Sequence, residues 1–382
     1  MKRTVLFIVL LSVFVARVFF AYADPVDKRT VRIAVLKNAE DCVISIRGSY
    51  KIYDIVTGDL LASSIKLKRS RVVVQDYGIH VGQRFYSTKK LRIKLQKDVT
   101  IYSADKKKSY RGEILILAND EGKFAVINDL DLELYVKGVL YHEVSHKWPI
   151  EAIKAQAVAT RTYALYQTIV NKDQQFDVTS DIYSQVYGGR NAERFRTNIA
   201  AERTKKQILK YEGKVLPAYF HANCGGHTED VSELWKHDLA PLKGVVCAFC
   251  AKGPHNEWKI NFQLKVIQEK LNEKGYKVGL IKGIEILEKN RSGRVKMLKI
   301  ETRDDKSITV SGKDFRNAIG PNDLKSNKYD LVMKGYYVDV VGQGWGHGVG
   351  MCQWGAYQMA NENYNYKDIL EHYYPGAKIV KY

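Results

Sequence analysis

The chain has 382 residues, enough for one to three domains with a large core, and its formal net charge is +19. The positive charge is spread thinly and no RNA- or DNA-binding motif accompanies it, so we expect no nucleic-acid partner. For an exported chain, a positive field favours an anionic partner such as the cell wall or lipid headgroups.

The first 23 residues have the layout of a secretory signal peptide. A basic start at 1–3 precedes an apolar stretch at 5–20, and the sequence Ala-Tyr-Ala at 21–23 offers a cleavage site. Arg17 within the apolar stretch argues against a stable membrane span, and an uncleaved membrane anchor is the alternative. We therefore expect export to the periplasm, the cell wall or the medium.

Residues 24–128 have a β-rich pattern. Short alternating or β-branched runs, among them TVRIAVL, CVISIRG, YKIYDIV and GEILILA, are separated by Gly, Asn and Asp. The apolar run at 134–141 is interpreted as a strand-like segment that leads into Glu143. Residues 129–382 then combine helix and sheet patterns, with an inserted α/β segment at about 255–330. Because strands and helices are segregated along the chain, the predicted fold class is α+β.

The clearest helix is KWPIEAIKAQAVATRTYALYQTIVNK at 147–172. Its apolar residues follow one face, and Pro149 lies where a first helical turn accepts proline. Lys154 and Arg161 are seven residues apart and share a stripe beside the apolar one. They are either surface residues whose stems cover apolar surface or groups that reach into a polar cleft.

A glycine-rich stretch near the C-terminus, VGQGWGHGVGMCQWGA at 341–356, surrounds His347. Glycine at this density indicates special backbone angles or a close approach of another segment. The stretch is not a phosphate loop, because it lacks GxxxxGK[ST]. It is not a dinucleotide fingerprint either, because no βαβ unit of ~30 residues can follow it.

The five cysteines include a cluster with the spacing of a metal site. His221, Cys224, Cys247 and Cys250 combine H-x2-C with C-x2-C, which suits a structural zinc ion, and His227 is an alternative ligand. A disulfide from Cys224 to Cys247 or Cys250 is the second interpretation, and unlinked thiols are the third. All three interpretations stay open at the level of the sequence.

Two segments together resemble the stage II sporulation protein D family of peptidoglycan-degrading lytic transglycosylases. They are LDLELYVKGVLYHEVSHKWPIEAIKAQAVATRTYAL at 130–165 and GQGWGHGVGMCQWGA at 342–356. YFHANCGGHTEDVSELW at 219–235 and GKDFRNAIG at 312–320 are also similar to the family, so the resemblance covers roughly 30–382. It implies that the helix-and-sheet part is a catalytic core and that the substrate is the peptidoglycan glycan strand.

The resemblance implies that Glu143 is the catalytic residue. This carboxyl would protonate the MurNAc-GlcNAc glycosidic oxygen and then, as a base, help the muramic acid 6-hydroxyl to close a 1,6-anhydro-MurNAc end. No cofactor is required for this chemistry. The flanking apolar residues Tyr141, Val144 and Trp148 independently favour a raised pKa. Without the resemblance, a glutamate near a helix N-terminus is more simply read as balancing the helix dipole.

The resemblance also implies a set of substrate-binding residues. Some relatives hold zinc in the segment at 181–189, but Tyr183 and Ser184 occupy those positions here, so that zinc site is not expected. The implied substrate-binding residues are Lys154, Gln156, Arg161, Tyr163, Gln185, Tyr187, His347 and Gln353.

Other functions compete with the lytic transglycosylase. Some relatives are enhancers of a cell-wall N-acetylmuramoyl-L-alanine amidase, so a non-catalytic activator is the alternative, and the presence of Glu143 favours the enzyme. A metal-dependent hydrolase is disfavoured because full thiolate ligation leaves no open position on zinc. A Cys352–His347 peptidase dyad is disfavoured because it needs an acyl substrate and an oriented thiolate.

Overall fold

The computed structural model describes residues 29–75, 77–103, 106–181 and 184–382. The predicted signal peptide at 1–23 lies outside the described residues. The fold is mixed α+β with a strand-rich N-terminal part, which confirms the predicted fold class. None of the described helices combines the length and the apolar character that crossing a membrane would require.

The N-terminal part is a sandwich of two sheets. One has the strand order β13-β1-β12-β11-β8-β3-β4, and the other has the order β10-β9-β2-β5-β6-β7. Alternate residues of both sheets, such as Ile33 and Ile44, point into one shared core because side chains alternate between the faces of a strand. The strands are β1 (Thr30–Ala39), β2 (Asp41–Arg47), β3 (Tyr50–Asp54), β4 (Leu60–Ser64), β5 (Leu67–Gln75), β6 (Gly78–Val81), β7 (Arg84–Tyr86), β8 (Lys90–Leu95), β9 (Asp98–Ser103), β10 (Lys106–Tyr110), β11 (Glu113–Ala118), β12 (Phe124–Asp131) and β13 (Val178–Thr179).

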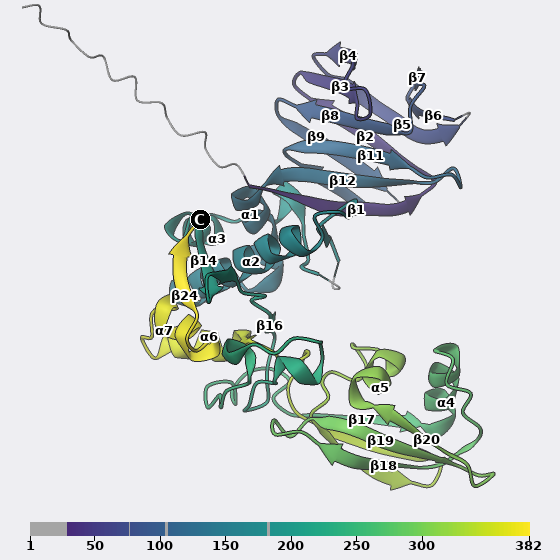
Figure 1. Cartoon of the computed structure of the whole chain (residues 1–382), viewed down its shortest axis with the longest axis vertical. Helices are drawn as coiled ribbons and strands as arrows, with labels where there is room; N and C mark the ends of the chain where they lie inside the picture. Colours follow the sequence, from purple (N-terminus) through teal and green to yellow (C-terminus); the bar gives the residue numbers. More distant parts are fainter. Residues whose placement is uncertain (1–28, 76, 104–105, 182–183) are drawn as a thin grey trace, which may run out of the picture.

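Helices and two small sheets follow the sandwich and lie between it and a third unit (Figure 1). The sheets have the orders β15-β14-β24 and β16-β23, so the end of the chain returns to the middle of the molecule. The elements are α1 (Leu132–Glu143), α2 (Ile150–Val170), η1 (Gly189–Ala192), α3 (Phe195–Arg203), β14 (Gln207–Tyr211), β15 (Lys214–Val215), β16 (Phe220–His221), η2 (Val231–Glu233), η3 (Ala240–Leu242), β23 (Met351–Cys352), α6 (Gln353–Asn361), α7 (Tyr366–Tyr373) and β24 (Lys378–Lys381).

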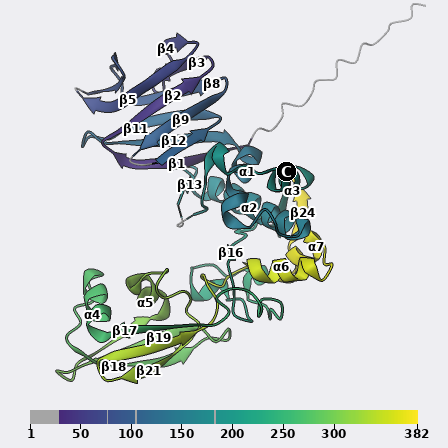
Figure 2. The ribbon, with the colours of Figure 1, turned by 180° about the vertical axis from the view of Figure 1, so that it is seen from behind.

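The third unit is inserted between β16 and β23 and has a core of its own. Two three-stranded sheets, β17-β22-β21 and β18-β19-β20, enclose this core together with α4 and α5. Figure 2 shows this unit and the sandwich at opposite ends of the molecule. Its elements are β17 (Trp258–Gln263), α4 (Leu264–Glu273), β18 (Ile281–Lys289), β19 (Val295–Thr302), β20 (Ser307–Ser311), α5 (Gly312–Ile319), β21 (Tyr329–Lys334) and β22 (Tyr337–Gly342).

The interpretation of 134–141 as a strand-like segment was wrong, because these residues belong to helix α1. Asp131 caps the helix by accepting hydrogen bonds from the backbone N–H groups of Glu133 and Leu134. The buried residues Leu132, Tyr135, Val136, Val139 and Leu140 then recur with helical spacing. Glu143 is therefore the last residue of a helix, and Val144 breaks the helix with an extended conformation.

The glycine-rich stretch makes the close approach that its composition predicted. Gly346 and Gly350 have φ of +112° and +71°, which side-chain-bearing residues rarely adopt. A Cβ on Gly346 would lie 2.7 Å from the Cβ of His221, and one on Gly350 would lie 2.0 Å from the carbonyl oxygen of Tyr219. The glycines thus let this stretch lie against residues 219–222, where β16 pairs in parallel with β23.

Candidate active site

A pocket of about 360 Å³ lies where the end of α1, residues 184–186, β16, the glycine-rich stretch and the start of α6 meet. Aromatic side chains form part of its wall. Tyr219 and Trp235 are stacked, with ring centroids 4.4 Å apart and an interplanar angle of 15°. The aromatic lining consists of Tyr163, Tyr219, Phe220, Trp235 and Trp345.

Glu143 contributes a carboxyl group to this pocket. Its Oε1 accepts a hydrogen bond of 3.1 Å from the backbone N–H of Val186, and the Gln353 side chain also hydrogen-bonds the carboxyl. Burial nevertheless dominates and raises the pKa of Glu143 from 4.5 to about 7. Its place at the C-terminus of α1 acts in the same direction, since that end of a helix disfavours negative charge. A substantial fraction of Glu143 is therefore protonated near neutral pH.

Gln353 is held beside Glu143 by the start of α6. Its amide donates to the side-chain oxygen of Gln156 at 3.3 Å, and Gln156 in turn donates to Thr160 at 3.2 Å. Gln156, predicted to bind substrate, is fully buried on α2 and is not among the residues that line the pocket. Its observed contacts give it a positioning role behind Gln353.

Two buried side chains in the pocket have polar atoms without a hydrogen-bond partner among the described residues. Gln185 accepts from the Tyr135 hydroxyl at 2.8 Å, but its Nε2 donor is unpaired. His221 has Nδ1 3.1 Å from the carbonyl oxygen of Val349, so Nδ1 carries the proton and the unpaired Nε2 is an acceptor. The pocket therefore offers one free donor and one free acceptor to a ligand.

His347 lines the pocket as a neutral imidazole. Its Nδ1 accepts from the backbone N–H of Val349 at 3.0 Å, and its ring lies 5.6 Å from that of His221. Burial, followed by the positive charge of Arg316, lowers the pKa of His347 to about 3. His347 is therefore uncharged at neutral pH and does not act as an acid toward substrate.

Two of the predicted substrate-binding residues on α2 have partners elsewhere. Arg161 is fully buried, and its guanidinium donates to both carboxylate oxygens of Glu133 at 2.9 and 2.8 Å. Lys154 donates to Glu151 at 2.6 Å. Neither of these predicted substrate-binding cations is among the residues that line the pocket, because α2 directs both of them to ion pairs with glutamates.

Tyr187 is also outside the pocket lining. The side chain is buried in the sandwich core, and its hydroxyl donates to Asn128 at 2.9 Å. Among the predicted residues, the structure thus brings together Glu143, Tyr163, Gln185, His347 and Gln353.

Sequence reasoning missed part of the pocket wall. His221 was predicted as a metal ligand, and Tyr219 and Trp235 were given no role, yet all three line the pocket. Tyr219 and Trp235 are the two ends of the segment at 219–235, and His221 lies within it. The resemblance of this segment to the family is the sequence feature that could have indicated their place in the site. Their convergence with Glu143 depends on the parallel β16–β23 pairing, which no local pattern reveals.

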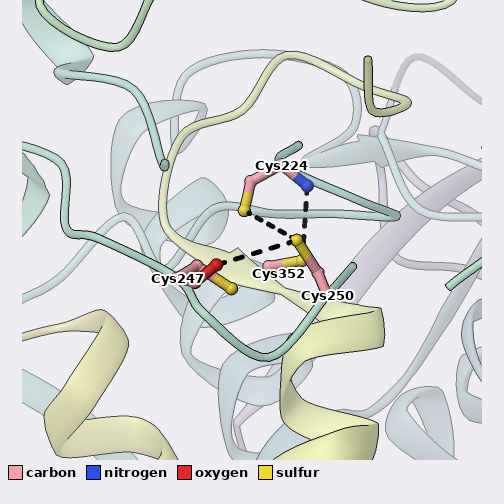
Figure 3. A group of neighbouring side chains, drawn as sticks. All are labelled: Cys224, Cys247, Cys250 and Cys352. Carbon is pink, nitrogen blue, oxygen red and sulfur yellow. Dashed lines mark hydrogen bonds between the residues drawn. The ribbon is translucent and has the colours of Figure 1, made fainter. Parts of the chain in front are cut away.

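Three of the predicted metal ligands, Cys224, Cys247 and Cys250, lie together in the structure, and Cys352 joins them. The sulfurs of Cys224, Cys247, Cys250 and Cys352 all lie within 4.8 Å of one another (Figure 3). His221 faces the pocket instead, as described above. The alternative ligand His227 has its Nδ1 2.6 Å from the carbonyl oxygen of Thr228. The β16–β23 pairing places His221 opposite Cys352, and it is Cys352 that completes the cluster.

A second pocket of about 530 Å³ adjoins the first and shares Trp235, Trp345, Gly346 and His347 with it. Its other wall comes from α5 and the following loop of the inserted unit, with Lys313 and Arg316 among the lining residues. We refer to these two adjoining pockets, which are lined by Glu143 at one end and by the inserted unit at the other, as the groove.

Two family models and several known proteins are similar to this chain. Residues 120–211 match the family model described as Stage II sporulation protein, SpoIID. Residues 252–350 match the model described as Domain of unknown function (DUF8618), which covers most of the inserted unit. An uncharacterised protein of Brachyspira hyodysenteriae is 32% identical over 364 residues, which span 95% of each chain.

Two relatives from Bacillus species carry descriptive names. The Stage II sporulation protein D of Bacillus amyloliquefaciens is 28% identical over 273 residues, which span 66% of this chain and 75% of that protein. The Amidase enhancer of Bacillus subtilis is 27% identical over 299 residues, which span 65% of this chain and only 40% of that protein. On these similarities, the chain belongs to the stage II sporulation protein D family.

Proposed function

We propose that this protein is an exported lytic transglycosylase that cleaves the MurNAc-GlcNAc bond of peptidoglycan glycan strands. Family membership and the similarity to an amidase enhancer support a role connected with the cell wall. Export is part of the proposal and rests on the basic and apolar pattern of residues 1–23.

The observation that carries the proposal is the single carboxyl group of the pocket. Among the described lining residues, Glu143 alone has a carboxyl side chain. Glycosidases that use water work with a pair of carboxyl groups, one of which acts on the water or on the sugar carbon. A single group whose pKa is raised to about 7 suits a reaction in which one residue serves first as acid and then as base.

In the proposed reaction, protonated Glu143 donates its proton to the glycosidic oxygen as the bond from C1 of MurNAc to that oxygen breaks. The GlcNAc-bearing fragment leaves as an alcohol, and Glu143 becomes a carboxylate. The carboxylate then accepts the proton of the MurNAc 6-hydroxyl while that oxygen attacks C1. The product is a 1,6-anhydro-MurNAc end, Glu143 is protonated again, and no water is consumed.

Neighbouring residues would orient the carboxyl and the sugar. The Val186 N–H and the Gln353 amide hold the Glu143 carboxyl in place. The Nε2 atoms of Gln185 and His221 supply a donor and an acceptor for sugar hydroxyl or N-acetyl groups. The stacked rings of Tyr219 and Trp235 offer apolar faces against which a sugar ring can pack.

A second candidate function is a non-catalytic activator of a cell-wall amidase. The similarity to the Amidase enhancer of Bacillus subtilis favours it. In that case the groove would bind glycan or the amidase without cutting a glycosidic bond.

The test is mass spectrometry of purified glycan strands, with and without stem peptides, after incubation with the protein. We expect 1,6-anhydro ends with the wild type and none with Glu143→Gln. Glu151→Gln is the matched control, because Glu151 is a nearby acid outside the pocket lining, and it should keep activity. If no glycan is cut by any form, while the wild type accelerates an added amidase, the activator replaces the enzyme.

A further inference from the structure

Four cysteines from three separate segments converge behind the pocket. Cys224 follows β16, Cys247 and Cys250 lie in the loop after η3, and Cys352 ends β23. All four side chains are buried, and Figure 3 shows them gathered around a common centre. The glycan chemistry proposed for Glu143 makes no use of them.

The arrangement suits four ligands around one ion. A tetrahedral zinc ion with Zn–S bonds of about 2.3 Å places its sulfurs roughly 3.8 Å apart. Here all four sulfurs lie within 4.8 Å of one another, and those of Cys224 and Cys250 are 3.5 Å apart. Mutual proximity of all four is what a single ion requires, whereas two disulfides require closeness only within each pair.

The surroundings of the sulfurs are suited to thiolates. The backbone N–H groups of Cys224 and Gly355 donate to the sulfur of Cys352 at 3.3 and 3.4 Å. The Tyr373 hydroxyl lies 3.1 Å from the sulfur of Cys247. Hydrogen-bond donors around ligand atoms are the usual outer layer of a metal site and stabilise the negative charge of its sulfurs.

Two basic side chains reach the backbone of the cluster. Arg294 is buried and donates to the carbonyl oxygen of Cys224 at 2.8 Å, and Lys328 donates to that of Gly225. A zinc ion with four thiolates has a net charge of −2, so cations at this distance offset part of the cost of burying it.

We propose that Cys224, Cys247, Cys250 and Cys352 bind one structural zinc ion. The ion would fasten the loop from 224 to 250 to the start of α6. Cys352 immediately precedes Gln353, which contacts Glu143, so the same ion would fix one wall of the pocket. All four zinc positions are filled by protein sulfurs, and the site is structural rather than catalytic. This assignment does not depend on the reaction proposed for Glu143.

The first test measures metal and thiols in the full chain purified without reductant or chelator. We expect about one zinc per chain by elemental analysis, and five reactive thiols after denaturation in the presence of a chelator. A metal-free chain with one reactive thiol would mean two disulfides and would overturn the proposal. A metal-free chain with five thiols, or bound iron in place of zinc, would overturn it as well.

The second test compares cysteine variants. Cys352→Ser should reduce the zinc content at least tenfold and lower the melting temperature by about 10 °C, because a structural ion contributes to folding free energy. Cys42→Ser is the matched control, since Cys42 is equally buried but lies in the sandwich core, and it should keep its zinc. His221→Asn should also keep zinc. Loss of zinc in His221→Asn but not in Cys352→Ser would overturn the proposal. It would mean that His221, and not Cys352, binds zinc together with the other three cysteines.

Discussion

Glu143 combines two properties at the residue scale, a fixed carboxyl orientation and a pKa raised to about 7. A group that acts first as an acid must be protonated when substrate binds. We therefore predict that kcat/KM on glycan strands falls as the pH rises above about 7, roughly tenfold per pH unit. A pH profile of initial rates measures this. A rate that stays constant to pH 9 would show that Glu143 does not act as the acid.

The raised pKa of Glu143 also predicts how the stability of the fold depends on pH. Because the folded-state pKa of about 7 exceeds the unfolded value of 4.5, the folded chain binds more protons between these pH values. The free energy of unfolding therefore falls as the pH rises from 4.5 to 7. Above pH 7, the contribution of Glu143 to this free energy no longer changes with pH. Glu143→Gln should be more stable than the wild type by ~2 kcal/mol at pH 8 and equally stable at pH 4. Denaturant unfolding at the two pH values measures the difference, and equal stability at both would contradict the shift.

Gln185 tests whether the unpaired donor of the pocket binds substrate. Gln185→Leu removes that donor, and we predict a loss of roughly tenfold in kcat/KM, corresponding to one hydrogen bond. Tyr135→Phe is the control, because it removes only the hydroxyl that donates to Gln185. It should cost less than the Leu variant in activity. Equal losses in the two variants would mean that Gln185 matters only for packing.

At the scale of elements, the glycine-rich stretch and β16 form one contact on which the pocket wall depends. We predict that Gly346→Ala is destabilising by about 3 kcal/mol, since the backbone angle is strained for alanine and the new Cβ would collide with His221. Gly213→Ala isolates the collision, because Gly213 also has positive φ but has open space around it. That variant should cost only about 1 kcal/mol. Chemical denaturation of both variants measures the difference, and equal costs would show that no steric contact is involved.

The elements differ in how far the sequence predicted them. Helix α2 was predicted because Pro149 marks its beginning and its apolar face is continuous. Helix α1 was missed because its apolar run was read without the cap at Asp131, although the buried positions have helical spacing. The two-residue pairing of β16 with β23 joins segments 131 positions apart, and no local sequence pattern predicts such a pairing.

Some of the predicted site residues line the pocket and others do not, and this difference also depends on packing between distant segments. The resemblance identified Glu143, Gln353 and His347, which the structure brings into one pocket. It could not tell that Arg161 is neutralised by Glu133, because that partner lies on another helix and the pair forms only after packing. Family patterns include residues that hold the fold as well as residues that face a ligand.

At the scale of the whole molecule, the inserted unit is docked against the loop that carries Cys224. Asn290 and Ser292, from the turn between β18 and β19, donate to the buried carboxylate of Glu229. Arg294 from the same turn donates to carbonyl oxygens of residues 224 and 227. These contacts set the inserted unit beside the groove, so it contributes one wall of the second pocket.

In the proposed reaction, one carboxyl group cuts the glycan strand without consuming water. Digestion of glycan strands in water enriched in oxygen-18, followed by mass spectrometry of the products, tests it most directly. We expect new 1,6-anhydro-MurNAc ends that contain no oxygen-18. Reducing ends that carry oxygen-18 would contradict it, because hydrolysis would require water and a second carboxyl group, acting as base or as nucleophile, which the described lining residues do not supply.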